Sequence, residues 1–209
     1  GKTLSYMEGS STSASNEEWF IDLCMDRDKS IYQRCEQMVA ETPYKDTVLF
    51  LPFIYATNVN IDAKAAFIGL QGEHTQAHML RALFEGVCFC HQMHIDRLTP
   101  HCKRPSVVRM AGGATRSSVW MQMFADILGL RVEVSEAEEL GAMGAALCAG
   151  VCAGVFDDLK KAAEEWVKIK AVYEPDQEKY TYYRKKYAAY CAVIDAMDGV
   201  WKNIEDLKV

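Results

Sequence analysis

The feature that most limits the fold of this sequence is a repeated change between short apolar segments and helical segments. A helix is predicted at 75–98, and its apolar side chains point all round the axis, which is typical of a buried helix. Short apolar strands are predicted at 48–51, 105–110 and 130–134, and a helix at 118–128 separates the last two. Strands that alternate with helices favour a layered α/β domain.

Local signals mark the ends of several of these elements. Thr75 is predicted to cap its helix, Ser117 or Ser118 to cap the next one, and Gly129 to end it. Asn16 is predicted to cap a helix near the beginning of the chain. The other expected elements are a strand at 2–8, helices at 16–25 and 28–41, a loop at 53–66, and helices at 141–154, from Asp157 and from Pro175 to the end.

The last helix is amphipathic and rich in tyrosine. We expect it to pack on its own domain, because an amphipathic helix gains most of its stability from covering a core. Its tyrosines are Tyr180, Tyr182, Tyr183, Tyr187 and Tyr190.

Composition excludes several classes of protein. The formal net charge is −6 and no run of Lys or Arg stands out, so neither nucleic acid nor an anionic membrane is expected as a partner. No apolar run reaches the roughly 18–20 residues of a membrane span. The eight cysteines are scattered through apolar segments, which predicts reduced, buried thiols and a cytoplasmic protein. Because Gly1 is not a methionine and a strand is predicted at once, we expect the chain to begin within a longer protein.

The segment richest in chemical signals is the loop between the strand at 105–110 and the helix at 118–128. Gly112 and Gly113 let the backbone turn sharply and let a flat or anionic ligand approach it. The beginning of the next helix would add backbone N–H groups without partners. This predicts a ligand site, although glycines in such a turn also occur in loops that bind nothing.

A dinucleotide site is a second interpretation of the same loop. Glu133 lies twenty positions after Gly113, where an acidic residue could bind a ribose. The glycine pattern G-x-G-x-x-G fails, however, because Ala114 and Ser117 stand where glycines are needed. Glu133 is therefore interpreted as a solvated charge at the end of a strand.

A metal site is suggested by Cys88, Cys90, His91 and His94 but is not expected. Successive helical residues are rotated by roughly 100°, so these four side chains cannot converge on one ion. His74 and His78 are interpreted as surface or packing residues, since His74 precedes the helix cap. We find no nucleophile elbow and no P-loop in the sequence.

Three motifs in order resemble the C-terminal domain of the FGGY carbohydrate-kinase family, over roughly residues 2–205. The first combines A-x-F-x-G-L at 65–70 with H-M-x-x-A-L-F-E at 78–85. The second is V-V-R-M-A-G-G at 107–113, followed by W-M-Q-M-F-A-D-I-L-G at 120–129. The third is E-E-x-G-A-x-G-A-A at 138–146. Within the family the sequence is most similar to xylulose-type kinases, L-xylulose kinases in particular.

This resemblance implies an actin-like, ribonuclease H-like ATPase lobe with a mixed sheet flanked by helices. It implies that residues 1–209 form a C-terminal domain incomplete at its N-terminal side, with the sugar-binding lobe absent. It also implies phosphorylation of a ketopentose with ATP and Mg²⁺. In the family the catalytic aspartate lies upstream, so no catalytic residue is expected in this chain.

By the same resemblance, Gly112 and Gly113 match glycines that pass close to the nucleotide, Ala114 belongs to the same loop, and Ser117 matches a polar position that contacts adenine. The sugar is the expected small-molecule partner, and a homodimer is left open. Two alternatives remain open: a non-catalytic actin-like nucleotide-binding module and a dinucleotide-dependent enzyme.

Overall fold

A computed structural model describes residues 6–9, 11, 13–137 and 139–207 of the chain. The described elements, in chain order, are α1 (Ser15–Cys24), α2 (Ile31–Glu41), β1 (Leu49–Leu51), β2 (Ala66–Ile68), α3 (Gln76–Leu98), β3 (Val107–Met110), the 3-10 helix η1 (Gly113–Arg116), α4 (Ser118–Leu128), β4 (Arg131–Ser135), α5 (Leu140–Cys152), α6 (Leu159–Trp166), β5 (Ile169–Tyr173) and α7 (Gln177–Glu205).

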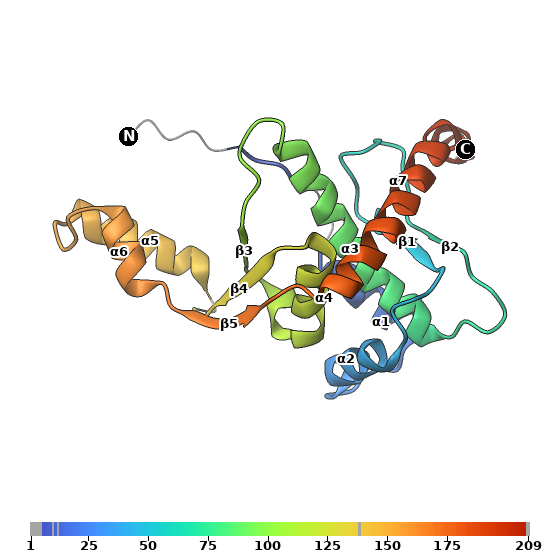
Figure 1. Cartoon of the computed structure of the whole chain (residues 1–209), viewed down its shortest axis with the longest axis horizontal. Coiled ribbons are helices and arrows are strands. Elements are labelled where there is room, and N and C mark those ends of the chain that lie inside the picture. Colours follow the sequence, from blue (N-terminus) through green and yellow to red (C-terminus); the bar gives the residue numbers. More distant parts are fainter. Residues whose placement is uncertain (1–5, 10, 12, 138, 208–209) are drawn as a thin grey trace.

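Two small sheets lie among these helices (Figure 1). In the larger, β4 lies between β3, to which it is parallel, and β5, to which it is antiparallel. In the smaller, β1 pairs with β2 in antiparallel fashion. The predicted mixed sheet with flanking helices is confirmed, but β2 and β5 were not predicted.

Helix α3 is the centre of the hydrophobic core. Every residue from 80 to 90 is buried, as its all-round apolar sequence predicts. It packs against β1 and against helices α1, α2 and α4. Its cap is also as predicted, since the Thr75 backbone N–H donates to His78 Nδ1 at 3.2 Å.

Helix α7 packs on its own domain, as predicted. Its side chains Tyr183, Tyr187 and Tyr190 are buried, whereas Tyr180 and Tyr182 are partly exposed. A buried polar cluster also joins it to α3 through two contacts of Glu85. Lys186 Nζ lies 2.6 Å from Glu85 Oε2, and the Tyr183 hydroxyl donates to Glu85 Oε1 at 3.1 Å.

The Glu85 cluster also reaches the end of α2. Arg81 Nε donates to Glu85 Oε1 at 3.0 Å, and Arg81 Nη1 donates to the backbone carbonyls of Val39 and Thr42. These carbonyls belong to the last turn and C-cap of α2, where a helix leaves acceptors unpaired. Arg81 Nη2 also donates to the Tyr183 hydroxyl of α7 at 2.8 Å, so one guanidinium connects α2, α3 and α7.

Three predictions about the first part of the chain are wrong. Residues 6–8 are not a strand, and residues 2–5 of the predicted strand at 2–8 lie outside the described residues. Asn16 does not cap α1 but lies buried within it, and its Nδ2 donates to the Ser13 carbonyl at 2.9 Å. Helix α2 begins at Ile31 and not at Asp28, because Asp28 Oδ1 accepts the backbone N–H of Ser30 in a turn.

Helices α5 and α6 form a pair at one end of the molecule (Figure 1). The cap of α6 is Asp158 and not Asp157, since Asp158 Oδ1 accepts the Lys161 backbone N–H at 2.9 Å. Among the described residues of these two helices, only Leu147 in α5 and Ala162 in α6 are buried. Glu138, which belongs to the third motif, lies outside the described residues.

The prediction that the cysteines are reduced and buried is only partly correct. None of the eight cysteines is in a disulfide. Cys35, Cys88 and Cys90 are buried as expected, but Cys24, Cys102, Cys148 and Cys152 are exposed. The exposed thiols lie on helix surfaces or in turns. The sequence around each cysteine does not show which thiols are exposed.

Candidate functional site

The site is built on the turn between β3 and α4. Gly112 has φ of 93° and ψ of −173°, a conformation that favours glycine. Its carbonyl accepts the Thr115 hydroxyl at 2.7 Å and the Thr115 backbone N–H at 3.1 Å, which closes η1. Ser117 then caps α4 as predicted, because its Oγ accepts the Trp120 backbone N–H at 3.1 Å.

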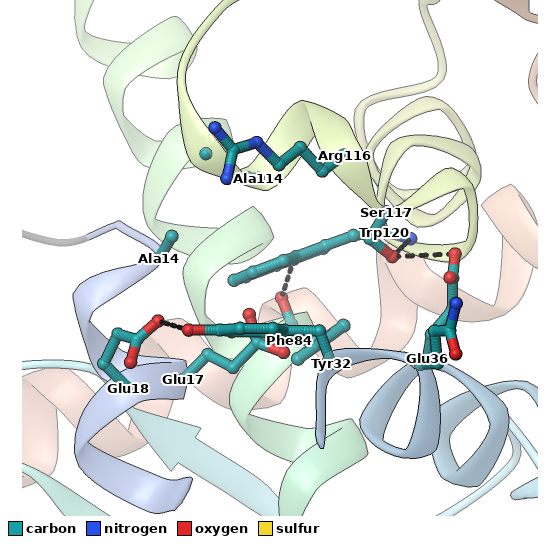
Figure 2. Close-up of a pocket in the computed structure, with 12 residues that line it drawn as sticks. Ala14, Glu17, Glu18, Tyr32, Glu36, Phe84, Ala114, Arg116, Ser117 and Trp120 are labelled. Atoms are coloured by element: carbon teal, nitrogen blue, oxygen red, sulfur yellow. Dashed lines mark hydrogen bonds between the residues drawn. The ribbon is translucent and has the colours of Figure 1, made fainter. Parts of the chain in front are cut away.

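A cavity of about 250 Å³ lies beside this turn (Figure 2). Gly113, Ala114, Arg116 and Ser117 line one side of it. The other side comes from the distant helices α1, α2 and α3. In Figure 2, Trp120 lies between these two sides.

Aromatic rings form much of the cavity wall. The Trp120 indole stacks on Phe84 with ring centroids 4.0 Å apart, and its Nε1–H donates to the Phe84 carbonyl at 3.2 Å. Tyr32 of α2 lines the opposite wall, where its hydroxyl donates to Glu18 of α1. Apolar walls with a few fixed polar groups are typical of a small-molecule site, and this volume suits part of a ligand such as a nucleoside.

A second, more polar cavity of about 260 Å³ lies across the same loop. Gly113 and Arg116 line both cavities, whereas Gly112 lines only the second among the described residues. Lys170 of β5 also lines the second cavity. Of the predicted site residues, Gly113, Ala114 and Ser117 therefore meet at the aromatic cavity, and Gly112 faces the polar one.

The backbone N–H groups predicted to be free at the beginning of α4 are occupied. Glu36 of α2 accepts the Val119 N–H at 3.0 Å and the hydroxyls of Ser117 and Ser118, each at 3.1 Å. Burial alone would raise the pKa of Glu36, yet these hydrogen bonds lower it below its ordinary value. The Glu36 carboxylate thus occupies the N-terminus of α4. The expectation that this helix N-terminus presents free N–H donors to a ligand is wrong.

Glu17 of α1 lines the cavity and has a raised pKa. Burial, followed by the negative charges of Glu18 and Glu36, raises its pKa to about 7. Sequence reasoning missed Glu17, Glu18, Tyr32 and Glu36 as site residues. No local pattern marks them, because their place beside the glycine loop depends on how α1 and α2 pack.

Glu133 is not the solvated charge that was predicted. It lies within β4, buried, with Oε2 3.1 Å from Arg109 Nε and Oε1 3.1 Å from Arg131 Nε. Hydrogen bonds from these two arginines lower its pKa. Because both carboxylate oxygens are engaged, the dinucleotide interpretation loses its ribose ligand.

Three of the histidine and cysteine side chains of α3 lie near one another, since the His91 and His94 ring centroids are 5.6 Å apart and Cys90 contacts His94. Cys90 Sγ lies 3.9 Å from His94 Nε2, while His91 packs edge-on against Phe124 at 5.2 Å between ring centroids. His74, before α3 as predicted, and His78 both face Asp46, with Nε2–Oδ distances of 3.0 and 3.9 Å. Among the residues that the structure describes, no group of three or more His, Cys, Asp or Glu side chains is placed to hold a metal ion.

Within the described ranges, each helix is too short or too polar to cross a bilayer.

Comparison with known families identifies the class of protein. Residues 1–153 match the family model described as "FGGY family of carbohydrate kinases, C-terminal domain". This match spans the glycine loop, α4 and all of the aromatic cavity. The chain belongs to the FGGY family of carbohydrate kinases, and its fold is that of the family's actin-like C-terminal lobe.

Two curated sugar kinases are similar in sequence to most of this chain. The chain is 36% identical over 200 residues to the L-xylulose/3-keto-L-gulonate kinase of Escherichia coli (strain K12), covering 95% of this chain and 40% of that protein. It is 37% identical over 201 residues to a probable L-xylulose kinase of Haemophilus influenzae (strain ATCC 51907 / DSM 11121 / KW20 / Rd), covering 92% and 39%. The chain therefore spans about two-fifths of the length of these curated relatives.

Solved structures show the same fold. The crystal structure of xylulose kinase from Rhodospirillum rubrum matches with a TM-score of 0.82 and 26% identity, covering 91% of this chain and 39% of that one. The structure of Plasmodium falciparum glycerol kinase with ADP matches with a TM-score of 0.74 and 26% identity, covering 88% and 36%.

Proposed function

We propose that this chain is the nucleotide-binding lobe of a longer kinase that phosphorylates a ketopentose with MgATP. The observation that carries the proposal is the aromatic cavity beside the Gly112–Gly113 turn, in a lobe of a carbohydrate-kinase family. Xylulose-type kinases among the relatives support the substrate class. In this proposal the sugar-binding lobe and the catalytic base lie outside residues 1–209.

The two cavities suggest a direction for the nucleotide. The base and ribose would occupy the aromatic cavity against Trp120 and Ala114, and the phosphates would pass Gly113 toward the polar cavity with Arg116 and Lys170. A glycine at 113 suits this path, because a Cβ there would project into otherwise open space, with only the Ala14 Cβ as near as 4.0 Å. Phosphate oxygens and the rest of the kinase would supply most Mg²⁺ ligands, since Mg²⁺ is commonly held between substrate phosphates and one or two carboxylates.

The proposal is tested with the kinase that contains this chain. ADP release is measured with MgATP and each of D-xylulose, L-xylulose, L-ribulose and glycerol. One ketopentose is expected to raise turnover far above the background ATPase rate. A protein that binds nucleotide but responds to none of these sugars would contradict the ketopentose assignment and favour the non-catalytic module.

A matched pair of variants locates the nucleotide. Gly113→Val adds a side chain where the cavity is open, and it is expected to raise the KM for ATP about ten-fold or more. Gly199→Val makes the same change on the exposed face of α7, outside both cavities, and should leave the KM unchanged. Equal kinetics for the two variants would place the nucleotide elsewhere.

A further inference from the structure

Glu17 differs from the other two carboxylates of the aromatic cavity in having no hydrogen-bond partner among the described residues. Glu18 accepts the Tyr32 hydroxyl and lies 2.8 Å from Arg27 Nη2, and Glu36 accepts three donors at the beginning of α4. Glu17 lines the same cavity from the first turn of α1 (Figure 2). Its carboxyl group is therefore available to a ligand.

The surroundings of Glu17 favour its neutral form. Glu18 lies on the same helix, α2 contributes Glu36, Tyr32 and the buried thiol of Cys35, and η1 contributes the exposed guanidinium of Arg116. Burial and the two neighbouring carboxylates raise the pKa of Glu17 to about 7, so the acid is largely neutral in mildly acidic solution.

A neutral carboxyl group has a hydrogen-bonding pattern that adenine matches. It offers one O–H donor beside one C=O acceptor, as a glutamine amide offers N–H beside C=O. Adenine presents an exocyclic amino donor beside a ring-nitrogen acceptor, the pair that Asn and Gln read in nucleic acids. The pairing edge of guanine instead presents two adjacent N–H donors, which match an ionised carboxylate with two acceptors.

We propose that Glu17 reads the nucleobase as a neutral carboxylic acid and thereby selects adenine over guanine. The proposal rests on the function proposed above, because it assumes that a nucleoside occupies this cavity. It adds the residue that determines base specificity. Ser117, the position matched to an adenine contact, has its hydroxyl engaged with Glu36 and the Trp120 N–H in this structure.

The test measures binding of adenosine and guanosine to this chain by calorimetry at several pH values. Nucleosides are the probes because a phosphate group would itself titrate near pH 6. If only neutral Glu17 pairs with adenine, the adenosine affinity of the wild type should be about ten-fold weaker at about pH 8 than at about pH 6. Guanosine affinity should not fall over this range.

Two variants separate base recognition from a general effect of charge. Glu17→Gln carries the donor and acceptor of the neutral acid at every pH, so it should bind adenosine as the wild type does at about pH 6, with no pH dependence. Glu17→Ala should bind adenosine weakly at every pH. The proposal is overturned if the adenosine affinity of the wild type, like that of Glu17→Gln, does not change with pH.

Thermal unfolding without ligand checks the state of Glu17 independently. An acid whose pKa is raised on folding destabilises the folded state as pH rises from its ordinary value of 4.5 to about 7. The melting temperature of the wild type should therefore fall relative to that of Glu17→Gln across this range. If neither adenosine nor ADP binds the folded wild type, the proposed function and this inference both fail. If adenosine binds with an affinity that does not change with pH, only the inference is refuted.

Discussion

Helix α3 and strand β1 approach so closely at Gly86 that any side chain there must force them apart. A Cβ built on Gly86 would lie 2.3 Å from the Phe50 carbonyl oxygen. Real Cβ atoms essentially never approach another heavy atom more closely than 3.0 Å. The obstacle is backbone in a buried strand, so no side chain can rotate away. For Gly86→Ala we expect overpacking to cost about 3 kcal/mol, offset by about 1 kcal/mol from the better helix propensity of alanine. The net effect should be a loss of about 2 kcal/mol.

Gly199 provides the matched control for this substitution. It also lies within a helix, α7, but a Cβ there meets nothing within 4 Å. Gly199→Ala should therefore show only the propensity term and stabilise the chain by about 0.5–1 kcal/mol. Urea unfolding followed by circular dichroism measures both changes through the midpoint at constant slope. A Gly86→Ala chain as stable as the wild type would refute the reasoning from the close approach.

The remaining predictions concern buried and partly buried charges. Glu85→Gln removes the carboxylate that contacts both buried cations, Arg81 and Lys186, so urea unfolding should show a loss of about 3–5 kcal/mol. Lys186→Met keeps the Arg81–Glu85 pair and should cost clearly less; an equal loss would contradict this charge balance. The lowered pKa of Glu36 implies stability that is complete above its ordinary pKa of 4.5 and lost as pH falls through the lower folded value. Glu36→Gln should therefore flatten the acid limb of the stability curve, and an unchanged limb would contradict this assignment.

The helices of the fold were largely predictable because their ends are set by nearby residues. Thr75 and Ser117 cap their helices through contacts three residues away, and Gly129 ends α4 with φ of 61°. The strands were less predictable. Strand β5, at 169–173, has mostly exposed side chains and is held by its pairing with β4, a partner that local sequence does not reveal.

The candidate site was predictable only on one side. Gly113, Ala114 and Ser117 follow from the glycine turn and its resemblance to a family motif. Glu17 and Glu36 lie about 80–100 positions earlier in the chain and reach the loop only because α1 and α2 pack against α3. The same packing brings Glu36 onto the N–H groups of α4, which local reasoning assumed to be free.

The indole resonances of the four tryptophans test directly whether the aromatic cavity beside the glycine turn holds the nucleotide. Trp120 lines the cavity, whereas Trp166 in α6 and Trp201 in α7 line neither cavity. Titration of the ¹⁵N-labelled chain with ADP should shift the Trp120 indole signal and leave those of Trp166 and Trp201 in place. An unmoved Trp120 signal at saturating ADP would contradict the account.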